Sequence, residues 1–134
     1  MSTARFRRSC GGVTSLDLHV VWCRKYRRRI LGGRVAARLN GLVEKIADDH
    51  GWEIVASEVM ADHLHIFVRA RATDSAAEVV EAFKGRTSQA LRAEFPWLGR
   101  KSVLWSKSYF AASVGYVSES TVRRYIEHPW DEAA

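Results

Sequence analysis

Alternation of apolar and polar residues between His63 and Ala70 constrains the fold of this chain more than any other stretch. A period of two predicts a β-strand with one apolar and one polar face. The apolar face carries Leu64, Ile66, Val68 and Ala70, and the opposite face carries His63, His65, Phe67 and Arg69. Two imidazoles side by side are placed as two ligands of one metal ion would be. Because a lone His-X-His pair is more often structural or incidental, its interpretation depends on the rest of the chain.

Further periodic segments surround this strand. Alternation predicts strands at 14–22, 52–60 and 103–114, and helical spacing predicts helices at 34–49 and 75–94. The order β-α-β-β-α-β is that of an α+β, ferredoxin-like split βαβ sandwich, an antiparallel sheet with helices on one face. The uncovered face would then carry His19, His63 and His65. Gly85, inside the second helix, predicts a close approach by another backbone or by a ligand.

Length and composition fit one domain, 1–134, in which we expect residues 1–12 to form a flexible basic arm. No apolar run approaches the length of a membrane span, and the polar N-terminus lacks the apolar region of a secretory signal. The two cysteines, Cys10 and Cys23, lack a Cys-X-X-Cys spacing. This favours a reduced, cytoplasmic chain over a disulfide-stapled secreted one.

The charge balance favours a polyanionic partner. Lys and Arg number 21 against 15 Asp and Glu, a net charge of +6, and binding of cations to phosphates releases counterions. One run places five cations around Tyr26, namely Arg24, Lys25, Arg27, Arg28 and Arg29. We expect this basic cluster to contact phosphate, and the alternative is a solvated charged loop. A smaller group, Arg5, Arg7 and Arg8, lies near the N-terminus.

Other histidine chemistries do not match the spacing. A histidine-triad phosphotransferase needs a third His where Phe67 stands, and a two-histidine phosphoesterase needs His-X-Thr elements that the chain lacks. A structural zinc site needs four ligands, and the cysteines are not suitably spaced. Neither a P-loop nor a Gly-X-Ser-X-Gly elbow is present.

What remains is a two-histidine site with a nucleophile elsewhere in the chain, and Tyr125 is the best placed to attack a phosphate. It lies on a last predicted helix, 118–128, beside Arg123 and Arg124 and one turn before His128. The alternative is a packed core tyrosine, because Tyr125 also belongs to an apolar i, i+3, i+4 stripe.

Five stretches, taken in order, carry a resemblance to a known family. They are His19-Val20-Val21-Trp22-Cys23-Arg24-Lys25-Tyr26-Arg27, Asp62-His63-Leu64-His65-Ile66-Phe67-Val68, Phe83-Lys84-Gly85-Arg86-Thr87-Ser88, Trp105-Ser106-Lys107-Ser108-Tyr109-Phe110 and Val122-Arg123-Arg124-Tyr125-Ile126-Glu127. In this order they resemble the single-tyrosine HUH transposases of the IS200/IS605 insertion-sequence family. The stretches cover nearly all of the chain from Thr14 onward.

The resemblance implies an enzyme that cuts and rejoins single-stranded DNA at the ends of a mobile element. Tyr125 would be the nucleophile, forming a 5′-phosphotyrosine and releasing a 3′-OH, and His63 and His65 would be ligands of Mg²⁺ or Mn²⁺. No nucleotide cofactor is implied, because the phosphotyrosine conserves the energy of the phosphodiester. The family also implies a homodimer in which the tyrosine helix can complete the partner's site, and a prokaryotic, nucleoid-associated location.

One position departs from the family pattern. The family usually carries a glutamine ligand four residues after its tyrosine, and here that position is Pro129, which has no donor in its side chain. We favour His128 as the substitute third ligand. Glu58 or Asp62 are alternatives, and a further alternative is a weakened site in a decayed or domesticated copy.

The resemblance also implies imperfect DNA hairpins as partners. Lys84 and Arg86 join the basic cluster as expected DNA contacts, and Tyr26, Trp105 or Tyr109 are candidates for stacking on an extruded base. Of these we expect Trp105, like Trp22, to pack in the core. Two other functions stay open: a non-catalytic nucleic-acid-binding module on the same fold and, more remotely, a metal-dependent phosphohydrolase of small substrates.

Overall fold

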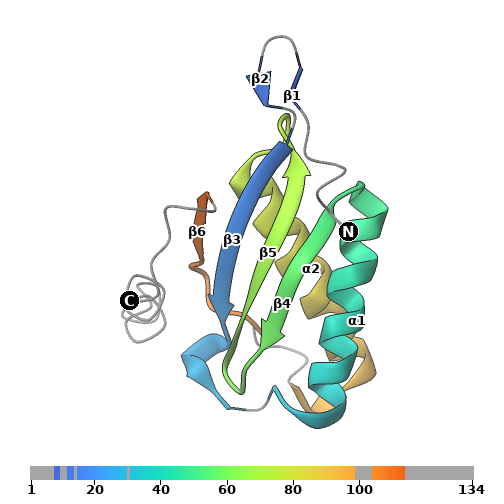
Figure 1. Cartoon of the computed structure of the whole chain (residues 1–134). Helices are drawn as coiled ribbons and strands as arrows, with labels where there is room; N and C mark the ends of the chain where they lie inside the picture. The colour runs from blue at the N-terminus through green and yellow to red at the C-terminus, as the bar shows by residue number, and fades with distance from the viewer. Residues whose placement is uncertain (1–7, 10–11, 14, 30, 99–103, 114–134) are drawn as a thin grey trace.

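The computed structural model describes residues 8–9, 12–13, 15–29, 31–98 and 104–113. Within these ranges a four-stranded antiparallel sheet has the order β4-β5-β3-β6, with β3 Ser15–Cys23, β4 Glu53–Val59, β5 His63–Arg71 and β6 Phe110–Ser113. Two helices, α1 (Gly33–His50) and α2 (Ala76–Glu94), lie on one face of this sheet (Figure 1). The predicted α+β, ferredoxin-like sandwich is therefore confirmed.

Short elements flank this framework. A 3₁₀ turn, η2 (Lys25–Arg27), follows β3, and a second one, η3 (Pro96–Leu98), follows α2. Inside the predicted N-terminal arm, β1 (Arg8–Ser9) pairs with β2 (Gly12–Val13). Among the described helices none is long and apolar enough to cross a membrane. The predicted last helix, 118–128, lies outside the described residues.

Strand register determines which side chains share a face. β3 and β5 pair antiparallel, with Cys23 opposite His63, Val21 opposite His65 and His19 opposite Phe67. Because side chains of paired residues point to the same side of a sheet, the histidines of both strands lie on one face. That face is the one opposite α1 and α2.

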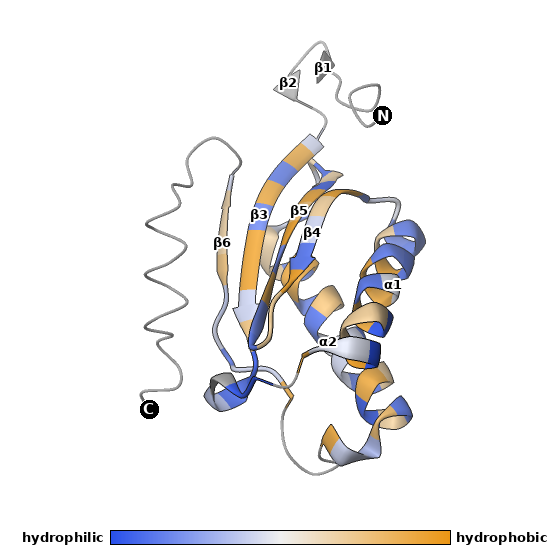
Figure 2. Cartoon of the chain, turned by 60° about the horizontal axis from the view of Figure 1, so that its bottom comes forward, coloured by the Kyte–Doolittle hydropathy of each residue, from blue (hydrophilic) through white to orange (hydrophobic). Residues whose placement is uncertain are grey.

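Both helices contain hydrophobic and hydrophilic residues (Figure 2), and each buries one set of side chains in the core. In α1 the buried residues are Val35, Leu39, Leu42, Val43, Ile46 and Ala47. This helix ends at Gly51, whose φ of 75° is a left-handed conformation that favours glycine. α2 begins with the predicted capping box, in which Ser75 and Glu78 accept each other's backbone N–H. None of the described residues comes within 4 Å of a Cβ placed at Gly85, so none of them makes the predicted close approach by another backbone.

Aromatic side chains fill the core between the sheet and the helices. Trp22 of β3 stacks on Phe83 of α2, with ring centroids 6.2 Å apart, and meets Trp105 edge-on at 5.8 Å. All three are at most 2% exposed, which confirms the core packing predicted for the two tryptophans. Each such aromatic pair adds about 0.5–1.5 kcal/mol beyond the burial of its area.

The predicted strand at 103–114 is wrong over the described residues that precede Phe110. There Trp105 makes only an isolated bridge to Arg24, and the regular strand is limited to Phe110–Ser113. The Lys84 ammonium group of α2 accounts for this difference, because it binds the carbonyls of Ser106, Lys107 and Ser108 at 2.6, 3.3 and 3.3 Å. Backbone carbonyls bound by one side chain are not available to a regular ladder.

Candidate functional site

His63 and His65 lie on the sheet face opposite the helices, as the alternation predicted. Leu64, between the two histidines, and Ile66, which follows His65, are fully buried in the core. Both histidines stay partly exposed. Their rings are nearly parallel, with an interplanar angle of 16° and centroids 6.0 Å apart. The strand period has therefore placed two imidazoles together on an accessible surface.

Asp62 orients the His63 ring. Nδ1 of His63 lies 2.7 Å from Oδ1 of Asp62, and since a carboxylate only accepts hydrogen bonds, Nδ1 carries the proton. Nε2 then presents its lone pair, which is the state that a metal ligand needs. Asp62 is 6% exposed, and its backbone carbonyl accepts the N–H of Arg24 at 2.8 Å. The residue that follows β3 thus holds the carboxylate in place.

His65 is engaged at both ring nitrogens. Nε2 lies 3.1 Å from Oε1 of Glu58 and Nδ1 lies 3.4 Å from Nε2 of His19. Burial lowers the pKa of His65 below its usual value, the Glu58 carboxylate opposes this shift, and His63 adds to it. The net lowering favours the neutral imidazole, which is the form that binds metal. The Glu58 side chain is 62% exposed, so it can turn away from Nε2 into solvent at small cost.

His19 supports His65 from the neighbouring strand. It is 7% exposed and packs against Phe67, with ring centroids 4.4 Å apart. Among the described residues its buried Nδ1 meets no hydrogen-bond partner. For Nε2 of His65 to bind a metal ion, Nδ1 of His65 must carry the proton and donate to Nε2 of His19. Burial, and then the nearby His65, lower the pKa of His19. The sequence placed His19 on the right face, but only the β3–β5 register shows that it meets His65.

His63 and His65 alone would supply only two of the ligands that a metal site needs. Among the described residues, no three His, Cys, Asp or Glu side chains are grouped so that they could hold a metal ion. Three positions named in the sequence analysis lie outside the described residues. They are the predicted nucleophile Tyr125, the favoured third ligand His128, and Pro129, where the sequence departs from the family pattern. The roles predicted for them stay predictions.

The basic cluster separates into a buried and an exposed part. Arg24 is 3% exposed, and its guanidinium group donates to the carbonyl of Leu104. Burial lowers the pKa of Arg24, and the charge of Arg28 lowers it further. Arg28 and Arg29 are exposed and Lys25 is half-buried, whereas the side chain of Arg27 is not described. Of the cations expected to contact phosphate, Arg24 therefore holds the protein together instead of facing solvent.

The two expected DNA contacts on α2 are also engaged with protein groups. Lys84 binds the three carbonyls of 106–108, and Nη2 of Arg86 lies 2.9 Å from Oδ2 of Asp49 on α1. Hydrogen bonds from Lys45 and Arg86 lower the pKa of Asp49. These cations join α2 to the segment before β6 and to α1, which the sequence pattern did not indicate.

Comparison with known proteins places the chain in a family. The family described as "Transposase IS200 like" matches residues 12–129. The ISDra2 transposase TnpA of Deinococcus radiodurans is 33% identical over 125 residues, which cover 91% of this chain and 89% of that protein. The transposase of insertion sequence IS200 from Salmonella typhimurium is 26% identical, covering 85% and 76% of the two chains.

Solved structures share the fold. A Deinococcus radiodurans R1 protein described as a transposase superposes with a TM-score of 0.83 at 31% identity, covering 91% of this chain and 96% of that one. A tyrosine transposase bound to a REP hairpin has a TM-score of 0.60 at 17% identity, covering 93% and 74%. The matched length, the identity to relatives and the shared fold agree with one another, and the chain belongs to the IS200-like transposase family.

Proposed function

We propose that this chain cuts and rejoins single-stranded DNA at the ends of an insertion sequence. Family membership supports the reaction class. The observation that carries the site is the Asp62–His63 pair, which presents a lone pair at Nε2 beside the parallel ring of His65. The site lies on the sheet face that the helices leave uncovered, where a DNA strand has access.

Tyr125 is the proposed nucleophile. Its phenolic oxygen attacks the scissile phosphorus, the bond from phosphorus to the 3′ oxygen breaks, and that oxygen leaves with a proton as a 3′-OH. The phosphorus remains attached to the 5′ oxygen, so the product is a 5′-phosphotyrosine. Because one phosphoester forms as another breaks, a 3′-OH can reverse the step and rejoin DNA without a nucleotide cofactor.

His63 and His65 are the proposed ligands of a divalent ion, with His128 as the third. When bound there, an ion of this class, Mg²⁺ or Mn²⁺, would supply Lewis-acid polarisation of a phosphate oxygen and would help to orient the phosphodiester. The described residues fit two ligand positions: Asp62 fixes the tautomer of His63, and burial favours neutral His65. Asp62 acts as the group that orients a ligand, an arrangement common around metal-bound histidines.

The proposed partner is DNA with hairpin ends, bound by a homodimer. A structural neighbour of the same fold is a tyrosine transposase bound to a REP hairpin, and the exposed cations Arg28 and Arg29 supply charge for phosphate. In the dimer, the helix carrying Tyr125 completes either its own site or the site of the partner.

The test is a covalent-adduct assay with an oligonucleotide that carries the element's end. We expect wild-type protein with Mn²⁺ to form a denaturation-resistant DNA adduct and Tyr125→Phe to form none while still binding the oligonucleotide. Tyr109→Phe is the control, because Tyr109 is an exposed tyrosine among the described residues, and it should form the adduct normally. An adduct formed by Tyr125→Phe would show that another residue is the nucleophile.

A second candidate function is hairpin-DNA binding without cleavage. It is favoured by the proline at position 129, where the family usually carries a glutamine ligand. Calorimetry with Mn²⁺ separates the two functions. Binding that is lost in a His63→Ala, His65→Ala double variant supports the enzyme, and absence of such binding in wild-type protein supports the binding module.

A further inference from the structure

The side chain of Tyr26 stands out on the surface. It is 64% exposed, although a tyrosine ring is large and mostly apolar. Among the described large hydrophobic residues only Trp97 is as exposed, also at 64%. Tyr26 lies in the η2 turn, which leads away from the end of β3. An aromatic ring that the core does not need is a candidate for contact with a ligand.

The backbone of Tyr26 is held in an unfavourable conformation. Its φ of 60° and ψ of 16° are left-handed, and no other described residue apart from glycine has a positive φ. Such a conformation costs about 1–2 kcal/mol for a residue with a Cβ. A strained bulky residue persists only where the surrounding structure determines it, and such residues gather at functional sites.

Backbone hydrogen bonds hold the chain that leads into Tyr26. The N–H of Arg24 donates to Asp62 at 2.8 Å, and the N–H of Lys25 donates to Leu104 at 3.1 Å. The N–H of Ser106 donates to the carbonyl of Cys23 at 2.9 Å. The chain that leads into Tyr26 is therefore bound to two neighbouring segments. The result is a ring that is presented on a fixed base.

Cations surround the ring. Nζ of Lys25 lies 5.4 Å and Cζ of Arg28 lies 5.9 Å from the centroid of the Tyr26 ring. Arg29, the next cation along the chain, is exposed. An aromatic face between positive charges matches one unit of single-stranded nucleic acid, because the base stacks on the ring while the phosphates on either side meet the cations.

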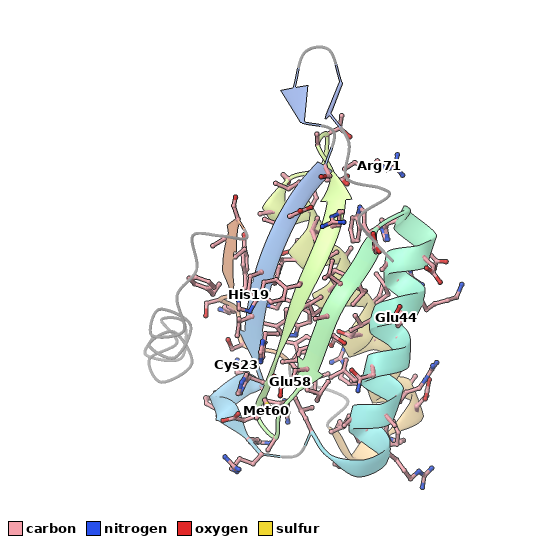
Figure 3. All side chains as sticks on the ribbon, viewed as in Figure 1. His19, Cys23, Glu44, Glu58, Met60 and Arg71 are labelled. Carbon is pink, nitrogen blue, oxygen red and sulfur yellow. The ribbon has the colours of Figure 1, made fainter. Side chains whose placement is uncertain are left out.

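The turn lies at the end of the sheet that carries His63. β3 ends at Cys23, the register partner of His63, and the turn begins two residues later. In Figure 3 the labelled Cys23, Glu58 and Met60 gather at this same end, below His19. The turn and His63 therefore lie at the same end of the sheet.

We propose that Tyr26 is a stacking platform for an unpaired base of single-stranded DNA, next to the site that contains His63 and His65. This inference rests on the proposed function for its ligand class. Within duplex DNA each base face is covered by its neighbours, so the ring has nothing to stack on except at the ends. Tyr26 therefore selects unpaired DNA, whereas the cations of the same turn bind any phosphate backbone.

The test measures binding of a fluorescein-labelled 20-mer of thymidylate, so that it requires no cleavage and no known target sequence. Tyr26→Asn suits the backbone, because asparagine tolerates a left-handed φ, and it should keep the wild-type melting temperature. Loss of one stacked base should weaken binding about tenfold, within the range of about 5- to 100-fold for such contacts. Tyr26→Phe keeps the ring and should bind within about twofold of wild type.

Two further measurements isolate stacking from charge. The salt dependence of affinity should be unchanged in Tyr26→Asn, whereas Arg28→Ala should reduce its slope by about 0.7 for one lost contact to single-stranded phosphate. Trp97→Ala is the matched control, since Trp97 is an equally exposed aromatic in η3, and its affinity should equal that of wild type. Affinity for a 20-base-pair duplex should not change in Tyr26→Asn.

Several outcomes would overturn the inference. They are unchanged affinity of Tyr26→Asn for the single strand, an equal loss in Trp97→Ala, and an equal loss for duplex DNA. If wild-type protein does not bind single-stranded DNA at all, both this inference and the proposed substrate class are wrong. If wild-type protein binds single-stranded DNA and Tyr26→Asn binds it with the same affinity, the stacking platform is wrong and the proposed function stands.

Discussion

Oδ1 of Asp62 accepts a hydrogen bond from Nδ1 of His63 across 2.7 Å. The two residues are adjacent in sequence, at the start of β5, and both side chains are at most 12% exposed. Because the carboxylate is buried and the Asp62 backbone is bound by the N–H of Arg24, the imidazole has one tautomer and one orientation. The site is thus ordered at His63, whereas the exposed Glu58 makes the neighbouring His65 adaptable.

Replacement of Asp62 tests this relationship. Asp62→Asn keeps an acceptor for Nδ1 but removes the negative charge that makes Nε2 more basic, so we expect Mn²⁺ affinity to fall about 10- to 100-fold. Isothermal calorimetry measures this affinity directly. Asp48→Asn removes a carboxylate from the exposed face of α1 and serves as the matched control. Equal affinities in the two variants would show that Asp62 does not tune the site.

Stability of the metal-free protein should fall in acid because of His19 and His65. Burial is the main cause that lowers both pKa values from the usual 6.5. Between the lowered native pKa values and about pH 6.5 the unfolded chain therefore binds more protons, so the free energy of unfolding rises with pH there and levels off above it. Urea unfolding at a series of pH values below and above 6.5 measures this slope.

A variant at His19 checks whether His19 and His65 cause this pH dependence of stability. His19→Gln keeps a polar side chain of similar length but removes one titrating group, so the loss of stability on acidification should be smaller than in wild type. His50→Gln, a change at the end of α1, leaves His19 and His65 in place and should keep the wild-type dependence. A His19→Gln profile identical to that of wild type would contradict the role of this pair.

Lys84 should matter more for stability than for DNA binding. Its ammonium group binds carbonyls of three consecutive residues, 106–108, and Lys84→Met leaves those acceptors unsatisfied, at a cost of about 1–3 kcal/mol. Chemical denaturation measures the loss, and faster hydrogen exchange at the Ser106 amide should accompany it. Lys45→Met, which breaks only an exposed pair with Asp49, should cost much less.

DNA binding by the same variant distinguishes this role from the one that the sequence suggested. If Lys84 contacts phosphate, Lys84→Met reduces the salt dependence of single-strand affinity by about 0.7. We expect no such reduction, because the ammonium group already serves the backbone before β6. A reduced slope together with unchanged stability would restore Lys84 as a DNA contact.

The local sequence pattern was sufficient to predict much of the fold, because strand faces and helix ends depend on residues that are close together in the sequence. A period of two placed His63 and His65 together on one face, and the Ser75–Glu78 pattern predicted the start of α2. Helical spacing predicted α1 within one residue at each end. These features follow from the geometry of strands and helices, in which the side-chain direction is determined by position along the element.

Residues whose role depends on distant partners were not predictable in this way. Arg24 and Arg28 belong to one basic run, yet Arg24 is buried against Leu104, 80 residues away, while Arg28 is exposed. Lys84 is predicted from the sequence to meet DNA, and the structure shows that it binds the segment before β6, which the sequence pattern did not indicate. The position of a lysine or arginine in the sequence does not indicate whether its partner is a protein carbonyl or a DNA phosphate, because neither kind of contact has a characteristic period.

The amino-acid sequence by itself determined the order of the elements, the face that carries the histidine pair and the family resemblance. Only the tertiary structure decided that His19 meets His65, that Asp62 fixes His63, and that Tyr26 stands exposed on a strained turn. The physical reason is that strand faces follow from local stereochemistry. Register, side-chain partners and the strain of a turn are determined by contacts between segments that are far apart in the chain.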